Sequence, residues 1–216
     1  MYKSLLLSSV YTCIFTLAAS TTSTAAIFYT DEASFNAALG GINANIESFE
    51  TPFTTATTVN FSTLSVTQLG GGSGIVSCPT SSLCGGALPT DGSNTIGIVD
   101  NNFNGNQLSF DFSSPINAFS IDVVAALDFG GFSQFILSND NGDSQTMFTG
   151  PIPTETRFVG LSDFTRSFSN VTINSTLTGD GIQFDRVQHV SVVPIPAALW
   201  LFGSGLLGLV GMAIRK

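Results

Sequence analysis

The sequence predicts an all-β protein whose folded part is a sandwich of two sheets. Apolar and polar residues alternate with a period of two through much of residues 27–192, as they do in strands that bury one face. No segment there has the length and period of the helix that a parallel crossover needs, so the strands should pair antiparallel. Short runs of Gly, Asn, Asp and Ser separate the strands, which is typical of the turns in a sandwich.

About ten strands and one short helix are expected. Residues Asp31–Leu39 predict the helix, with Thr30 as its N-cap. The segment Asn139–Asp143 predicts a hairpin turn through Asn141-Gly142, because this dipeptide favours tight turns. The expected strands are Asn45–Glu50, Val59–Leu69, Thr95–Val99, Leu108–Phe112, Phe119–Ala125, Phe135–Leu137, Ser144–Phe148, Thr156–Val159, Phe168–Ile173 and Gly181–Phe184.

The strong negative charge of residues 27–192 argues against some classes of binding partner. Residues 27–192 contain three arginines and all 15 acidic residues of the chain, a net charge of −12. Such a surface repels phosphate backbones, so we expect no nucleic-acid partner. The same surface tolerates divalent cations, so a bound structural cation such as Ca²⁺ stays one of the alternatives.

The first 26 residues predict a secretory signal peptide. Lys3 is followed by a mostly apolar stretch and then by small residues that end in Thr24-Ala25-Ala26. Export to an oxidising compartment favours a disulfide between Cys78 and Cys84, which are the cysteines outside this segment.

Residues 193–216 predict a membrane anchor in three parts. The motif Val193, Pro194, Ile195, Pro196 precedes an uncharged apolar run, residues 197–214, and Arg215 and Lys216 follow it. As a helix the run of 18 residues is roughly 27 Å long, close to the ~30 Å core of a bilayer. The two cations are typical of a cytoplasmic flank, and the prolines mark the outer boundary of the helix.

This three-part tail resembles the PEP-CTERM sorting signal of Gram-negative bacteria. Residues Val193–Pro196 are similar to its Val-Pro-x-Pro variant, with Ile195 in place of the Glu that gives the signal its name. The resemblance implies recognition by an exosortase, transient anchoring in the inner membrane, cleavage near the motif, and a final location at the cell surface or outside the cell. An ordinary anchor without processing is the alternative.

Segments of residues 27–192 are similar to other ectodomains that carry this signal. They are residues 31–39, 46–50, 108–112 and 181–187. The resemblance implies a jelly-roll fold of the carbohydrate-binding kind, without transferring a binding site.

Few residues outside the tail point to chemistry. Glu50, Asp100 and Asp185 stand at predicted strand ends, where they either hold a structural Ca²⁺ or are solvated. Residues Asp128–Phe132 place two Phe beside glycines, for stacking on a sugar or for the core. His189, the single histidine, is expected in a solvated linker.

We therefore expect an exported, non-catalytic surface or matrix protein associated with exopolysaccharide. No nucleophile elbow, His-Glu-x-x-His motif or phosphate-binding glycine loop is present in the sequence. Two alternatives stay open: a glycan hydrolase that uses a carboxylate pair, and a surface protein that associates with itself. The expected partners are the exosortase, the inner membrane and a polysaccharide.

Overall fold

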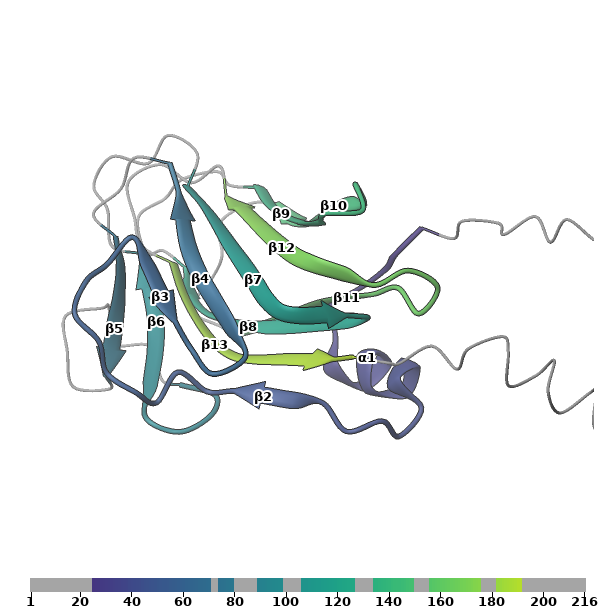
Figure 1. Ribbon diagram of the computed structural model, residues 1–216, viewed down its shortest axis with the longest axis horizontal. Helices are drawn as coiled ribbons and strands as arrows, with labels where there is room; N and C mark the ends of the chain where they lie inside the picture. The colour runs from purple at the N-terminus through teal and green to yellow at the C-terminus, as the bar shows by residue number, and fades with distance from the viewer. Residues whose placement is uncertain are drawn as a thin grey trace, which may run out of the picture.

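The computed structural model contains two antiparallel β-sheets packed face to face, with a short helix on the outside of one of them (Figure 1). Within the described residues no helix is long and apolar enough to span a bilayer. The structure describes residues 25–70, 74–79, 89–98, 106–126, 134–149, 156–175 and 182–191.

The first sheet, sheet A, has the strand order β1-β11-β8-β13-β6-β5, and β2 also pairs with β13. Every strand pair in it is antiparallel. Its strands are β1 (Ile27–Tyr29), β2 (Asn45–Glu47), β5 (Ile75–Pro79), β6 (Asn94–Ile98), β8 (Ala118–Ala126), β11 (Arg157–Ser162) and β13 (Ile182–Val190).

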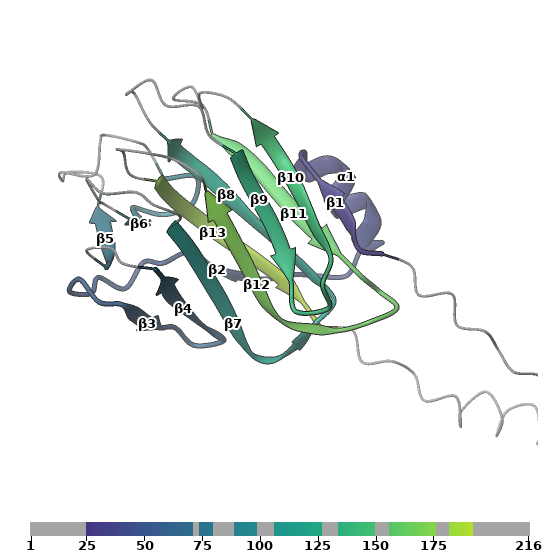
Figure 2. The ribbon, with the colours of Figure 1, turned by 90° about the horizontal axis from the view of Figure 1, so that it is seen from above.

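The second sheet, sheet B, has the order β10-β9-β12-β7-β4-β3, and it too is antiparallel throughout. Figure 2 shows β9, β12 and β7 of this sheet passing over β11, β8 and β13 of sheet A. Its strands are β3 (Thr58–Asn60), β4 (Leu64–Leu69), β7 (Asn106–Ile116), β9 (Gln134–Asn139), β10 (Ser144–Thr149) and β12 (Phe168–Ser175).

The chain alternates between the sheets in the manner of a jelly roll. Strands β6, β7 and β8 lie in sheets A, B and A, the β9–β10 hairpin lies in B, and β11, β12 and β13 lie in A, B and A. The resulting four-strand orders, β6-β13-β8-β11 and β7-β12-β9-β10, are those of an eight-stranded double-sheet jelly roll. The predicted all-β, two-sheet architecture is confirmed.

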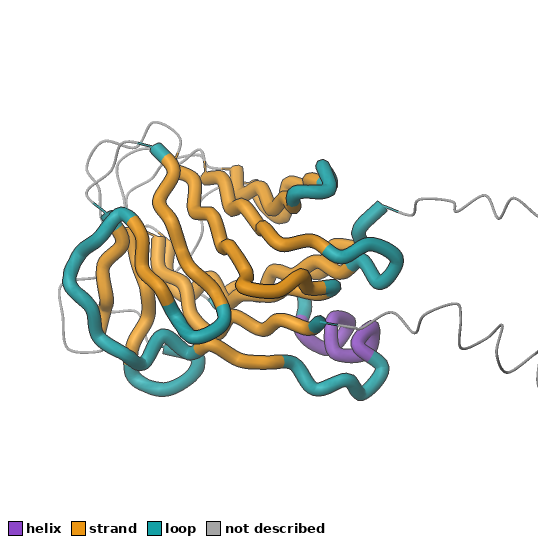
Figure 3. Tube along the Cα trace, viewed as in Figure 1, coloured by secondary structure: helices purple, strands orange, loops and turns teal. Residues whose placement is uncertain are grey.

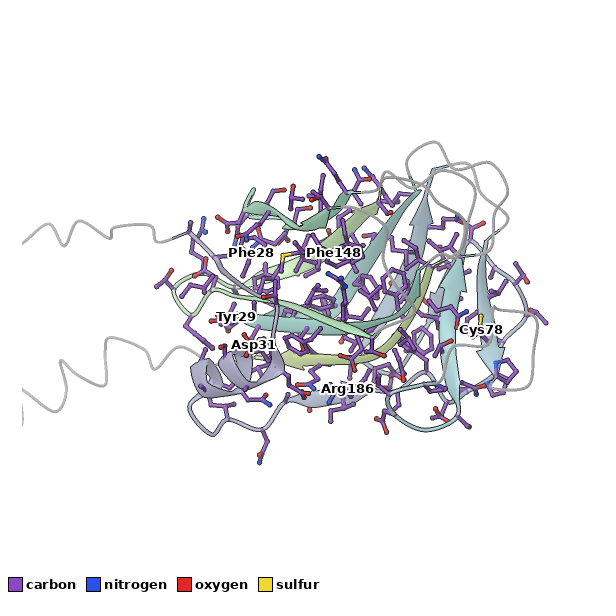
Figure 4. The ribbon with its side chains drawn as sticks, turned by 180° about the vertical axis from the view of Figure 1, so that it is seen from behind. Phe28, Tyr29, Asp31, Cys78, Phe148 and Arg186 are labelled. Atoms are coloured by element: carbon purple, nitrogen blue, oxygen red, sulfur yellow. The ribbon has the colours of Figure 1, made fainter. Side chains whose placement is uncertain are left out.

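Phenylalanine fills the space between the sheets. Phe110 of sheet B and Phe119 of sheet A are both fully buried, with ring centroids 5.5 Å apart. At one edge of the sandwich, Phe148 of β10 stacks on Phe135 at 4.6 Å, and the Arg157 guanidinium of β11 lies 5.3 Å from the Phe148 ring centroid. Phe28 of β1 packs against the core near this edge (Figure 4).

The one helix in the described ranges, α1 (Glu32–Leu39), covers part of the outer face of sheet A (Figure 3). Asp31 caps it by accepting a hydrogen bond from the Ser34 N–H at 2.8 Å, so the cap lies one residue after the predicted Thr30. Phe35 and Leu39 are buried in a second apolar cluster together with Tyr29, Ala118 and Val190.

Most expected strands are present, and the structure differs from the predicted strand boundaries at a few places. The predicted strand Val59–Leu69 is two strands, because a turn closed by a 2.8 Å hydrogen bond from Phe61 N to Leu64 O interrupts it. The last strand continues to Val190, six residues beyond the predicted end. Strands β1 and β5 were not expected; β1 has three residues, and β5 follows the glycine-rich segment 70–74 directly.

Candidate functional site

The outer face of sheet A carries a partly buried cluster of charges around Arg186. Strand β13 bulges against β8 between Asp185 and Gln188, and Arg186 adopts a left-handed conformation there, with φ of 47°. Arg186 Nη1 and Nη2 donate to the two carboxylate oxygens of Glu32 on α1 at 2.7 and 2.9 Å, and Nε donates to Asp122 Oδ2 at 2.8 Å. Arg186 therefore fastens α1 to the sheet (Figure 4).

Asp185 is fully buried and has no cationic partner among the described side chains. Its Oδ2 accepts hydrogen bonds from the N–H groups of Thr90 and Asp91 at 2.6 and 2.9 Å, and its Oδ1 accepts one from Arg186 N at 2.8 Å. Thr90 Oγ1 lies between two carboxylates, 2.6 Å from Asp122 Oδ2 and 3.1 Å from Asp185 Oδ2. Burial raises the pKa of Asp185, and the backbone hydrogen bonds oppose that rise.

Residues 89–94 form a loop that Asp185 binds at Thr90 and Asp91, and Glu50 binds the other end of this loop. Its carboxylate accepts hydrogen bonds from Ser93 N at 2.9 Å, Ser93 Oγ at 2.8 Å and Asn94 N at 3.1 Å. These bonds, the one from Ser93 N above all, lower the pKa of Glu50. Gly92 between the two anchors has φ of 67°, and a Cβ at this position would overlap the Glu50 carboxylate, so the loop requires glycine here.

Two of the three predicted calcium ligands bind one loop through hydrogen bonds. Glu50 and Asp185 both accept hydrogen bonds from residues 90–94, while Asp100 lies outside the described residues. No group of three His, Cys, Asp or Glu side chains in the described ranges is placed to hold a metal ion. The calcium site stays a prediction, and the observed role of Glu50 and Asp185 is to anchor this loop.

Several other predicted residues are not placed. Cys78 is buried and disulfide-bonded, whereas its predicted partner Cys84 lies outside the described residues, so the pairing stays a prediction. Three further predicted features also lie outside the described residues and stay predictions. They are the loop 128–132, the sorting motif Val193, Pro194, Ile195, Pro196 and the basic pair Arg215 and Lys216.

The expectation of a solvated linker around His189 is wrong. His189 lies on β13 and is only 5% exposed, because this strand continues to Val190. Its ring packs against Phe112 with centroids 5.1 Å apart, and its Nε2 lies 3.1 Å from Thr63 Oγ1. Its Nδ1 is buried and has no hydrogen-bond partner among the described residues, and burial lowers the pKa of the imidazole below 6.5.

The outer face of sheet B, in contrast, is lined by small polar side chains. The strand registers align six hydroxyl-bearing residues in one row that crosses all six strands. All six are half-buried or exposed except Ser109, which is buried. This hydroxyl row consists, from β3 to β10, of Thr58, Thr67, Ser109, Thr172, Ser138 and Ser144.

A second polar row lies beside the hydroxyl row, two residues along each strand, and consists of Asn60, Ser65, Asp111 and Asn170. Hydrogen bonds fix the side chains of both rows at the centre of the sheet. Asp111 accepts from Asn170 Nδ2 at 2.6 Å and from Ser109 Oγ at 3.0 Å, and Thr172 Oγ1 donates to Asn170 Oδ1 at 3.1 Å. We call the two rows together the polar face.

The polar face is a hydrogen-bonding surface of hydroxyl and amide groups with one carboxylate, that of Asp111. Hydroxyl and amide groups both donate and accept hydrogen bonds, and Asp111 is the one ionisable residue in the two rows. The face offers no cation to an anionic ligand. It suits a ligand that itself carries many hydroxyl groups.

Sequence reasoning did not single out the polar face. The alternation of Ser109 and Asp111 with buried residues identified a strand, but a solvated strand has the same pattern. What makes the face distinctive is the alignment of residues as far apart in the chain as Thr58 and Thr172, and this depends on strand order and register.

Comparison with known proteins yields distant structural likenesses. No family model matches the sequence, and no curated protein matches it. A family 29 carbohydrate-binding module is similar with a TM-score of 0.40 and 15% identity, over 71% of this chain and 97% of that chain. A mutant of such a module in complex with mannohexaose is similar with a TM-score of 0.38 and 13% identity, over 71% of this chain and 100% of that chain. Because these TM-scores and identities are low, they assign neither a ligand nor a binding surface to this chain.

Replacing Asp185 by Asn should destabilise the fold by about 1–3 kcal/mol. Both carboxylate oxygens accept hydrogen bonds, and the Asn amide would turn an N–H group toward one set of these donors. Chemical denaturation with and without added Ca²⁺ measures the effect. A loss of stability that is independent of Ca²⁺ agrees with loop anchoring. A wild-type protein that Ca²⁺ stabilises and an Asp185→Asn variant that it does not would instead establish the ion site.

His189 should make the fold less stable as the pH falls from about 7.5 to 5. Its pKa in the folded state lies below the usual 6.5, so the unfolded chain takes up a proton that the folded protein resists. The free energy of unfolding should therefore decline over this range in the wild type and much less in His189→Gln. Since the chain has one histidine, no other imidazole contributes. Equal pH slopes for the two proteins would contradict this assignment.

Proposed function

We propose that this protein is an exported, non-catalytic surface or matrix protein that binds an uncharged extracellular polysaccharide on the polar face of sheet B. The observation that carries the proposal is the hydroxyl row, which crosses every strand of that sheet. Sugar hydroxyls donate and accept hydrogen bonds as the Ser, Thr and Asn side chains of this face do.

The layout of the polar face suits an extended chain rather than a compact ligand. Neighbouring strands are about 4.8 Å apart, so the row presents a hydroxyl at each such step over six strands. The rise per sugar in an extended β-linked polysaccharide is close to this spacing, which allows successive sugars to lie over successive strands. Short side chains also lose little conformational entropy when they bind.

The other sheet offers no comparable surface in the described part of the chain. On the outer face of sheet A, the polar side chains of Asp122, Gln183 and Asp185 are buried. Helix α1 and the 89–94 loop take up the hydrogen bonds of this cluster. Polysaccharide binding is therefore assigned to sheet B.

Charge favours a neutral glycan. Asp111 lies in the middle of the polar face, and its carboxylate would repel a uronic acid or a sulfate group. The net charge of −12 over residues 27–192 acts in the same direction at longer range.

The sequence supports the route by which the protein reaches a polysaccharide. Residues 1–26 have the pattern of a signal peptide, and residues 193–216 have the order of an exosortase sorting signal. In this proposal residues 197–214 hold the protein in the inner membrane until the exosortase cleaves near Val193–Pro196. The domain is then free at the cell surface or in the matrix.

Thr172→Lys should weaken binding of neutral matrix polysaccharide by at least about tenfold, or about 1.4 kcal/mol. Thr172 lies on the central part of the hydroxyl row, where a long cationic side chain would cover its neighbours. Affinity electrophoresis in gels that contain polysaccharide from the native host measures the change. Ala33→Lys on the exposed side of α1 adds the same charge and should bind like the wild type. Equal binding by both variants would move the site elsewhere.

The intact mass of the mature protein tests export and processing. From a host with its exosortase, the product should begin near Ile27 and end near Pro194–Pro196, and it should lie outside the inner membrane. In a host that lacks the exosortase, the C-terminus should be complete and membrane-bound. A complete C-terminus in both hosts would show that the tail is an ordinary anchor.

A further inference from the structure

The described chain leaves the sandwich at a well-defined corner. Ser191 Oγ donates to Pro115 O at 2.9 Å, and Asn117 N donates to Val190 O at 2.6 Å. Asp163 N in turn donates to Asn117 O at 2.8 Å. These bonds bring the end of β13, the β7–β8 turn and the β11–β12 turn together. We call this part of the molecule the exit end; it lies beside α1 (Figure 1).

Little chain separates the exit end from the predicted membrane segment. Five residues, 192–196, lie between Ser191 and the apolar run that begins at Ala197. Fully extended, they span at most roughly 20 Å. Strand β13 alone, with nine residues, is roughly 30 Å long. An anchored molecule must therefore keep its exit end close to the bilayer, while the opposite end of the sandwich stays away from it.

Large apolar side chains are exposed at this same end. Ile27 is 61% exposed and pairs with Ser162, directly before Asp163, and Phe164, directly after it, is 43% exposed. Ile42 is 44% exposed and lies in the connection from α1 to β2, where β2 begins opposite His189. Three of the five exposed large apolar residues in the described ranges thus surround the point where the chain leaves.

The charges next to Phe164 are paired with one another. Arg166 Nε donates to Asp163 Oδ2 and Arg166 Nη2 donates to Asp143 Oδ2, both at 2.7 Å. Asp163 is itself buried. Since these charges already have partners, the surface around Phe164 loses less hydration on approaching lipid than free carboxylates would.

We propose that the exit end rests on the surface of the phospholipid bilayer through Ile27, Ile42 and Phe164 while the protein is anchored. This rests on the proposed anchor, residues 197–214, and adds to it a defined orientation. Apolar side chains gain from transfer to the lipid interface, and the short tether raises their effective concentration there. Strands β7, β9 and β12 then run away from the membrane, and the polar face that they carry is accessible to polysaccharide.

Tryptophan quenching in the full-length chain tests the orientation. The chain has one Trp, Trp200 in the predicted anchor, so Trp200→Phe gives a background without Trp. In this background we compare Phe164→Trp with Leu69→Trp, in phosphatidylcholine vesicles whose acyl chains are brominated near the headgroup. Leu69 is a matched control because it is 40% exposed and pairs with Gln107, nine residues along β7 from Ile116 at the exit end.

The tryptophan of Phe164→Trp should be quenched several-fold more strongly than that of Leu69→Trp, and its emission should shift to the blue. Ile27→Trp should behave like Phe164→Trp. Equal, weak quenching of all three, with Trp200 of the wild type strongly quenched, would overturn the orientation and leave the anchor in place. Absence of quenching of Trp200 would overturn the anchor and the orientation together.

Discussion

The Arg186 guanidinium and the two carboxylates that it joins decide which surfaces of this protein are available. Arg186 lies at a bulge in β13, the strand that pairs with β2, β6 and β8, so its side chain leaves from the middle of sheet A. From there it reaches Asp122 on the sheet and Glu32 on α1. Gln188 Nε2 adds a 3.0 Å hydrogen bond to Glu32, and these bonds hold the helix over the sheet.

This cluster is costly unless each polar group has a partner, because Asp122 and Asp185 are buried and Arg186 is partly buried. The loop 89–94 completes it by donating backbone N–H groups to Asp185, and Glu50 keeps the far end of the loop in place. Among the described residues the cluster contains three carboxylates, those of Glu32, Asp122 and Asp185, and one guanidinium. Burial raises the pKa of Asp185, which has no cationic partner in these residues. Helix α1 and the loop 89–94 thus cover the charged cluster on the outer face of sheet A. The polysaccharide is proposed to bind the outer face of sheet B instead.

The direction of the strands relative to the exit end relates the proposed polysaccharide binding to the proposed orientation on the membrane. Strands β8, β11 and β13 of sheet A and β7, β9 and β12 of sheet B run between the exit end and the opposite end (Figures 1 and 2). The part of the hydroxyl row on β7, β12 and β9 would therefore cross these strands parallel to a membrane beneath the exit end. A polysaccharide bound along this row would lie parallel to the cell surface. The proposed cleavage near Val193–Pro196 falls beyond Ser191, so it would release the domain and leave the hydrogen bond from Ser191 Oγ to Pro115 O of β7 in place.

By itself, the sequence determined the secondary-structure class, a short helix at residues 31–39 and the hairpin at Asn141-Gly142, while the leader and the tail stay predictions. These depend on period, turn residues and apolar runs, which are local properties. It could not determine that Ser109 stands between Thr67 and Thr172, that His189 is buried against Phe112, or that Glu50 and Asp185 hold one loop. Strand order and register decided these contacts, because a sheet brings together residues that are far apart in the chain, and an alternating pattern is the same whichever strand lies next to it.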